Sequence, residues 1–235
     1  MNPEFQFEYE REGVVEVPGL YTASEIGVIC DALQRYVVEK VASLPRCDYV
    51  LEADGRAVRN LWRMEQHSEY FKALAEDERI RGRAKALVGS EPVLMAVESF
   101  CKPARVGSGV PPHQDNAYFC LAPPDALTIW IALDAVTPEN GPVNYVRGSH
   151  KGGVLPHARS GVAGNSVGLC DPLPEHEPFV GLLNPGDALI HHANTIHYSL
   201  PNRTDYARRA LLMVFRGSHC EPDPVLKKAY LAGQP

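Results

Sequence analysis

The sequence of 235 residues lacks the features that mark several special classes of protein. Its six cysteines include no CxxC pair, and the closest two, Cys30 and Cys47, are 17 residues apart. A structural zinc site of paired thiolates is therefore not expected. The longest apolar run, from Ala126 to Leu133, is about eight residues long and contains Thr128, whereas a membrane-spanning helix needs about 20.

Positive charge is also scarce in this chain. Lys and Arg total 23 against 29 Asp and Glu, which gives a net charge of −6, and no basic cluster stands out. Nucleic acids and anionic membranes are therefore poor candidates as partners. The acidic residues 1–13 contain no apolar stretch of the kind found in secretory signals, so we expect a cytoplasmic protein with free thiols.

The composition is that of an ordinary globular protein, with 45% hydrophobic and 22% charged residues, and it excludes intrinsic disorder. No repeat, low-complexity segment or linker divides the chain, so we predict a single domain over residues 1–235.

Helical signals gather in the first ninety residues. Thr22 and Glu25 form a capping-box pattern before an amphipathic stretch that continues to about Val41. A second helical stretch is predicted from about Glu69 to Val88, where Gly89 is a suitable C-terminal cap. Between them, residues 44–67 read as a loop with a short strand.

The pattern changes after residue 91. Short β-branched or alternating runs, separated by Gly, Pro, Asn and Asp, occur at 93–101, 126–136, 142–147, 179–183, 187–192 and 209–216. We therefore predict a mainly β protein, a sandwich or barrel with helices on one outer face. Its parts are a helical preface (about 1–90), a β core (about 91–216) and a tail (217–235).

Nine histidines raise the question of a metal site. Three His-x-Asp/Glu triplets occur, where chance alone would supply roughly one, so the motif by itself is weak evidence: His67-Ser-Glu69, His113-Gln-Asp115 and His219-Cys-Glu221. The first lies at the start of a predicted helix and the last in the tail. Pro111, Pro112 and Asn116 frame His113 as the end of a strand, and in a strand residues i and i+2 point to the same face, so His113 and Asp115 offer two ligands to one ion.

Two histidines and one carboxylate that leave positions open form the facial triad of non-haem Fe(II) oxygenases. The second histidine must come from a distant strand, and His191, His192 and His197 are all candidates on spacing alone.

Several ordered motifs resemble the phytanoyl-CoA dioxygenase-like family, and the resemblance covers about residues 5 to 216. They are His113-Gln-Asp115, Glu139-Asn-Gly-Pro142 before Gly148-Ser-His150, Gly186-Asp-Ala-Leu, and His197-x-Ser199-x-x-Asn202 before Arg208. Family membership implies a double-stranded β-helix (jelly-roll or cupin-like) core and a dioxygenase that uses Fe(II), 2-oxoglutarate and dioxygen.

The resemblance also assigns roles to individual residues. It implies that His113, Asp115 and His197 hold the iron and act as the catalytic centre. Arg208 takes the place of the arginine that binds the distal carboxylate of 2-oxoglutarate, through the two parallel hydrogen bonds that a guanidinium offers. Ser199 and Trp130 match further residues of the cosubstrate pocket, although plain core packing also explains Trp130.

The substrate is less determined by the sequence. Gln114 and Asn116 flank the predicted ligands and are candidates for substrate contact, and Arg59 and Arg63 precede the second helical stretch, where a loop would cover the site. We predict hydroxylation of an unactivated C–H bond of a small metabolite. That metabolite would be anionic if Arg59 and Arg63 bind it, whereas the alternative is that both arginines are solvated surface residues. Two alternatives stay open: a cupin-like metal enzyme without 2-oxoglutarate, and a non-catalytic binding protein on the same fold. The oligomeric state is left open.

Overall fold

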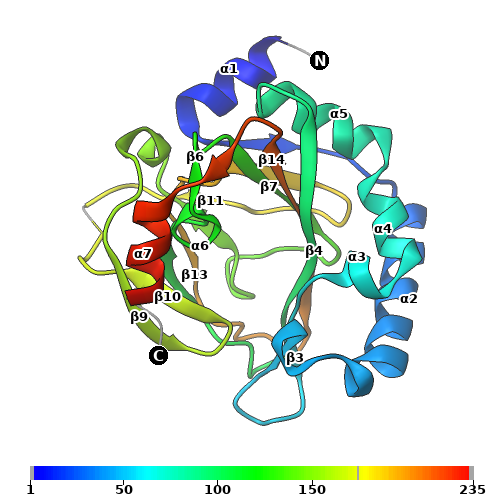
Figure 1. The fold of residues 1–235 in the computed structure, drawn as a ribbon. Coiled ribbons are helices and arrows are strands. Elements are labelled where there is room, and N and C mark those ends of the chain that lie inside the picture. Colours follow the sequence, from blue (N-terminus) through cyan, green and yellow to red (C-terminus); the bar gives the residue numbers. More distant parts are fainter. Residues whose placement is uncertain (1–2, 174, 233–235) are drawn as a thin grey trace.

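The computed structural model describes residues 3–173 and 175–232, and its centre is a barrel of antiparallel strands (Figure 1). The larger sheet has seven strands, in the order β1 (Val14–Val17), β12 (Ala188–His192), β7 (Ala126–Ala132), β14 (Arg208–Gly217), β4 (Pro92–Lys102), β3 (Val58–Leu61) and β2 (Tyr49–Leu51). The smaller sheet has four, in the order β11 (Phe179–Val180), β8 (Val143–Tyr145), β13 (His197–Ser199) and β5 (Val110–His113).

Two short strand pairs and the helices complete the described elements. The pairs are β9 (His157–Val162) with β10 (Asn165–Leu169), and β6 (Leu121–Ala122) with β15 (Glu221–Pro222). The helices are α1 (Pro3–Glu12), α2 (Ala23–Lys40), α3 (Met64–His67), α4 (Glu69–Ala75), α5 (Glu78–Leu87), α6 (Asn116–Phe119) and α7 (Pro224–Ala232). No helix in these described ranges is both long and apolar enough to cross a membrane.

The central strands are buried on both faces, which explains their nearly continuous apolar sequence. Along β7, Leu127, Ile129 and Ile131 point away from the barrel into a core shared with the helices. Trp130 and Ala132 alternate with them and point into the barrel. The same period of two governs β14, so odd-numbered residues face the helices and even-numbered residues face the interior.

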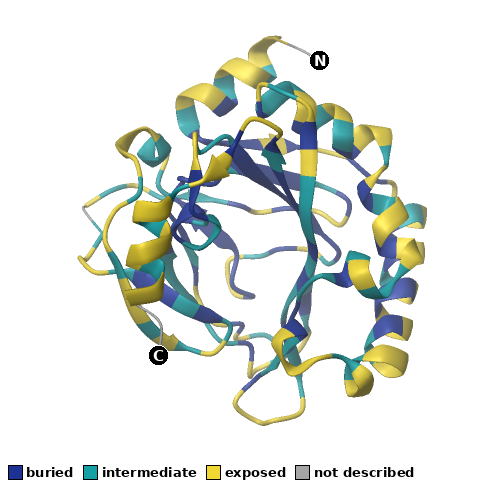
Figure 2. Cartoon of the chain, viewed as in Figure 1, coloured by how far each residue is buried: buried dark blue, intermediate teal, exposed yellow. Residues whose placement is uncertain are grey.

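Helices α1 to α5 cover one face of the seven-stranded sheet, as predicted for the N-terminal helices, and their outer sides are exposed (Figure 2). Helix α2 begins after Thr22 with the predicted capping box, and its buried side chains, Ile26, Ile29, Leu33 and Tyr36, lie on one stripe. The second predicted helix is divided in two, because the Asp77 carboxylate accepts the Arg79 amide and starts α5 anew.

Several elements were not expected from the sequence, among them α1, β1 and α7, which lie outside the predicted β core. Helix α1 and strand β1 lie within the predicted helical preface, and β1 pairs with β12 at the edge of the large sheet. Helix α7 lies in the predicted tail. The single domain and its internal boundaries stay predictions, but the preface contributes strands to the main sheet as well as helices.

Candidate active site

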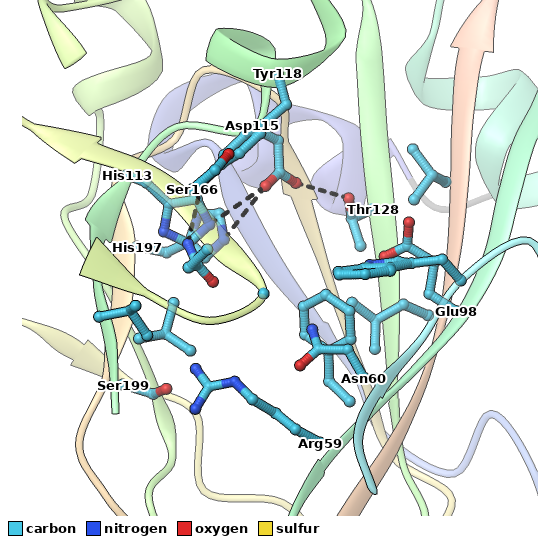
Figure 3. A pocket seen from close by; sticks show the side chains of 18 of the residues that line it. Arg59, Asn60, Glu98, His113, Asp115, Tyr118, Thr128, Ser166, His197 and Ser199 are labelled. Carbon is cyan, nitrogen blue, oxygen red and sulfur yellow. Dashed lines mark hydrogen bonds and ion pairs between the residues drawn. The ribbon is translucent and has the colours of Figure 1, made fainter. Parts of the chain in front are cut away.

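The three predicted metal ligands meet at one end of the smaller sheet. His113 is the last residue of β5 and His197 the first of β13, and the two are paired directly across the antiparallel ladder. Asp115 is not on a strand, contrary to the i, i+2 argument. It lies in helical backbone conformation immediately before α6, and the turn brings its carboxylate back toward both histidines (Figure 3).

The side-chain geometry suits a shared ion. One ligand atom from each of His113, Asp115 and His197 lies within 4.8 Å of the others. The Nε2 atoms of His113 and His197 are 3.6 and 3.5 Å from Oδ1 of Asp115. Each histidine also has Nδ1 within hydrogen-bond distance of a backbone carbonyl, that of Pro111 (2.9 Å) and that of Thr195 (3.0 Å). Donation from Nδ1 leaves the Nε2 lone pairs pointing into the site.

The two carboxylate oxygens of Asp115 have different surroundings. Its Oδ2 accepts a hydrogen bond from the Thr128 hydroxyl at 2.9 Å and lies 3.1 Å from Nε2 of His191. The Tyr145 hydroxyl lies 3.1 Å from the other nitrogen of His191. If Tyr145 donates to Nδ1, His191 donates from Nε2 to Asp115, and Oδ1 remains free for a metal.

Burial sets the charge states of these groups. Burial lowers the pKa of His113, and burial with the nearby His113 lowers the pKa of His197 well below its ordinary value. Burial alone would raise the pKa of Asp115, but His197 and His191 outweigh it and hold that pKa below its usual range. Neutral imidazoles beside a carboxylate are the protonation states that metal ligation requires.

The other histidines are engaged elsewhere. His192 points away from the barrel, where its Nδ1 accepts the Asn194 amide at 2.9 Å. His67 is 2.8 Å from Asp48, and His219 bridges Ser90 and Asp125 at 2.7 Å each. Sequence reasoning left His191 without a role, and only the structure shows that it contacts the predicted ligand Asp115.

A cavity of about 980 Å³ opens in front of the three predicted ligands. Arg208, Lys102 and Ser199 line one part, which we call the basic end. Arg208 is only 3% exposed, and one of its terminal nitrogens donates to the carbonyl of Gly141 at 2.9 Å, whereas its Nε has no partner. Its guanidinium carbon is 5.2 Å from the ring centre of Trp130, and burial lowers its pKa to about 10.

Arg209 points to the opposite face, where it forms a two-bond contact with Asp134 at 2.7 and 2.9 Å. The alternation of β14 thus brings Arg208, and not its neighbour, into the cavity.

Lys102 is a cavity residue that sequence reasoning missed. It is opposite Arg208 in the pairing of β4 with β14, and its Nζ donates to the carbonyl of Ser108 at 2.5 Å. Burial, together with the charges of Arg208 and Arg59, lowers its pKa to about 6. Alternation along the predicted strand 93–101 was the available signal, but it does not tell which face lines a cavity.

The four predicted substrate residues have other partners. Gln114 and Asn116 are buried and do not line the described cavity. The side-chain amide of Gln114 forms hydrogen bonds with backbone groups of Asn194, Gly153 and Leu155, and that of Asn116 with the backbone of Leu121. They hold the turn around Asp115, and their expected role in substrate contact stays a prediction.

Arg59 and Arg63 do line the cavity, but neither carries an uncompensated charge. Arg59 is 3.5 Å from the carboxylate of Glu52 and donates to the carbonyl of Gly109. Arg63 forms an ion pair with Asp48. Their role in binding an anionic substrate stays a prediction.

Glu98 marks a second part of the cavity, which we call the acidic end. Burial, with Asp115 and Glu65 nearby, raises the pKa of Glu98 to about 8. Figure 3 shows Glu98 and Thr128 on one side of the cavity, with His113 and His197 on the other.

Comparison with known proteins now decides the family. The family model for phytanoyl-CoA dioxygenase matches residues 9–210. The chain therefore belongs to the phytanoyl-CoA dioxygenase family. The resemblance predicted from the motifs is confirmed, and the predicted enzyme class, an iron- and 2-oxoglutarate-dependent dioxygenase, is that of the family.

Two relatives illustrate the range of named activities. The chain is 33% identical over 169 residues to dioxygenase lolE1 of Epichloe uncinata, covering 69% of this chain and 62% of that protein. It is 28% identical over 232 residues to a probable alpha-ketoglutarate-dependent hypophosphite dioxygenase of Stutzerimonas stutzeri, covering 94% and 81%.

A solved structure agrees with the fold. EvdO2 from Micromonospora carbonacea var. aurantiaca, complexed with 2-oxoglutarate, superposes with a TM-score of 0.72 at 25% identity, over 95% of this chain and 96% of that one. The predicted double-stranded β-helix is thereby confirmed.

Proposed function

We propose that this protein is an Fe(II)- and 2-oxoglutarate-dependent dioxygenase that hydroxylates an unactivated C–H bond of a small metabolite. The observation that carries the proposal is one arrangement: two Nε2 atoms and one carboxylate oxygen converge beside a buried arginine that lacks a partner for Nε. Such a combination serves no packing purpose, because an unpaired buried cation is costly unless a ligand supplies the counter-charge.

The residues present fit the implied iron. Two imidazole nitrogens and one carboxylate oxygen form the donor set of non-haem Fe(II) oxygenases, with positions left for other ligands. In the proposal, His113, Asp115 and His197 hold the ion, while Thr128 and His191 keep the carboxylate turned so that only Oδ1 faces it.

The basic end fits the dicarboxylate 2-oxoglutarate. Arg208 would bind its distal carboxylate, with Ser199 as a hydroxyl partner and Trp130 as the wall beside the guanidinium. Lys102 lies opposite Arg208 and would gain a counter-charge when the anion binds, which restores its own positive charge.

Bound iron and 2-oxoglutarate supply the oxidising chemistry, in which dioxygen is consumed, succinate and carbon dioxide are released, and a hydroxyl group replaces a substrate hydrogen. The protein's own contribution is to orient the reactants and to limit water. The hairpin β9–β10 lines the cavity with Gly161 and Ser166, and the Tyr118 hydroxyl of α6 holds it by donating to the carbonyl of Val167 at 2.7 Å.

Both alternatives make less use of this site. A cupin-like metal enzyme without 2-oxoglutarate has no need of a buried arginine at position 208. A binding protein needs neither the ligand set nor the fixed orientation of Asp115.

We also propose that the enzyme works in the cytoplasm, and the six free cysteine thiols support this.

The proposal is tested by adding ferrous iron and 2-oxoglutarate anaerobically and recording the visible charge-transfer band of the complex. Succinate release is then measured in air. Wild-type protein is expected to form the band and release succinate, whereas Asp115→Ala does neither. A wild-type protein that binds iron but shows no band with 2-oxoglutarate would refute the proposal and favour the cupin-like alternative.

A further inference from the structure

Glu98 differs from the other carboxylates at or beside the cavity. Asp48 pairs with Arg63, Glu52 pairs with Arg59, and Glu65 accepts the backbone amide of Val97 at 2.7 Å. No hydrogen bond or ion pair joins Glu98 to another residue in the described part of the chain. A carboxyl group kept in a cavity without a partner is costly for the fold alone, which indicates a function in ligand binding.

Strand register fixes where this group lies. Ala96, Glu98, Phe100 and Lys102 alternate along β4 and all line the cavity. Across the ladder, Lys102 is opposite Arg208 and Glu98 is opposite Leu212. Four residues of extended strand span about 13 Å, so Glu98 lies well away from the basic end.

The metal ligands lie between the two ends: His197 is two residues from Ser199 of the basic end on β13, and Asp115 is linked to β7. Leu212 is opposite Trp130 on the next strand, and Thr128, two residues before Trp130 in β7, hydrogen-bonds to Asp115. A molecule anchored at Glu98 therefore has its remaining atoms within reach of the iron ligands without occupying the basic end.

The surrounding chemistry favours a cation over an anion. The same cavity is lined by Trp62, Tyr118, Phe119 and Tyr230, and aromatic rings of this kind can attract a cation. The positive charges of Arg59 and Arg63 are already offset by carboxylates, so they do not call for an anionic ligand. The raised pKa of Glu98, which burial causes first of all, agrees with this, because a nearby cation would favour the charged carboxylate.

We propose that Glu98 binds a protonated nitrogen of the prime substrate, so that the enzyme takes small amines or amino acids rather than oxyanions. The inference rests on the proposed function, which supplies the oxidation. It replaces the anionic substrate expected from Arg59 and Arg63 with a cationic or zwitterionic one.

The test compares matched compounds on wild-type protein loaded with ferrous iron and 2-oxoglutarate under anaerobic conditions. The probes are pairs of a cyclic amine and its neutral oxygen isostere, such as piperidine and tetrahydropyran or cyclohexylamine and cyclohexanol, together with L-proline and hypophosphite. Titration calorimetry measures binding, and succinate release in air measures turnover. We expect at least one amine to bind more tightly than its isostere and to stimulate succinate release.

Two variants assign the preference to one residue. Glu98→Gln keeps the size of the side chain and removes its charge, and we expect the preferred amine to bind about 30-fold or more weakly, which is typical for one lost partner of a buried charge pair. Glu69→Gln is the matched control. The Glu69 side chain is 92% exposed, its carboxylate lies 3.9 Å from Nζ of Lys72, and it does not line the described cavity.

The results separate the two proposals. The charge-transfer band of the iron and 2-oxoglutarate complex does not depend on Glu98, so its absence in the wild type counts against the proposed function. With the band present, equal binding within each pair, tighter binding of hypophosphite than of any amine, no binding of the amines at millimolar concentration, or an unchanged preference in Glu98→Gln would overturn the role of Glu98.

Discussion

The two ends of the cavity stand on the same pair of strands, yet they treat buried charge in opposite ways. At the basic end, Arg208 and Lys102 face each other across β14 and β4, and the pKa of each is lowered by burial. At the acidic end, the pKa of Glu98 is raised by burial. In both places burial disfavours the charged form, and a bound ligand of opposite sign would offset this cost.

Strand register alone can separate the binding positions of two ligands of opposite charge. Residues 98 and 102 share one face of β4, whereas the candidate metal ligands lie on β5 and β13 of the smaller sheet and on the turn before α6. An anionic cosubstrate and a cationic substrate are thus kept apart on one rigid element. Four predictions test this arrangement, from the largest expected effect to the smallest.

Removing the centre between the two ends has the largest effect. Asp115→Ala or His113→Ala is expected to abolish iron binding and turnover, because each removes one of three ligands. Calorimetric titration with ferrous iron measures the loss, and thermal unfolding confirms that the variants remain folded. Iron affinity close to that of the wild type would place the metal elsewhere.

Damage to the basic end comes next. Arg208→Ala is expected to raise the 2-oxoglutarate requirement by roughly 2–5 kcal/mol of lost binding, as for other buried charge-assisted contacts. Arg209→Ala is the matched control, because its partner Asp134 lies on the other face of the sheet. Titration of succinate release with 2-oxoglutarate measures the difference, and equal effects in both variants would contradict the assigned face of β14.

The support behind the metal ligand is expected to matter less than the ligand. His191→Phe removes the contact with Oδ2 of Asp115 and is expected to lower iron affinity about 10- to 100-fold. His192→Gln is the control, since that side chain points away from the barrel and should leave the affinity unchanged. Similar losses in the two variants would show that His191 has no positioning role.

The smallest effect concerns stability at the acidic end. Since the pKa of Glu98 rises on folding from 4.5 to about 8, the folded protein binds more protons than the unfolded chain between these values, and wild-type stability falls as pH rises through them. Glu98→Gln lacks this cost.

The melting temperature of Glu98→Gln should therefore match the wild type near pH 5 and exceed it near pH 8. A difference of 1 kcal/mol corresponds to about 2–4 °C in a chain of this size. Scanning calorimetry of the empty protein at both pH values measures it, and a gap that does not grow with pH would show that Glu98 already has a counter-ion.

Much of this arrangement was accessible from the sequence because it depends on local periodicity. The capping box at Thr22, the strand positions and the alternation that separates Arg208 from Arg209 are all properties of short segments. The ligand set followed from a resemblance, since spacing alone left His191, His192 and His197 open.

The remaining features depend on contacts between distant segments. Asp48 and Glu52 lie more than four residues from the arginines that they neutralise, so nothing local indicates that Arg63 and Arg59 are paired. Likewise, nothing local indicates that the side-chain amide of Gln114 donates to the backbone carbonyl of Asn194, 80 residues away. Sequence periodicity finds the faces of strands, but only the fold tells which face encloses space.

The fixed register of β4 against β14 also has a consequence for regioselectivity. Positions 96 and 98 face the same cavity, one strand repeat apart, so transferring the carboxylate by the double change Ala96→Glu and Glu98→Ala displaces the anchor by about 7 Å without turning it out of the cavity. A different carbon of the same amine would then be presented to the metal. The spacing of residues along one face of β4 therefore sets the steps by which directed evolution could move the oxidised position. A one-residue insertion between 98 and 102 would instead move one of the two charged side chains to the face of β4 that packs against the helices. The distance between the two charges can therefore be increased only in steps of two residues.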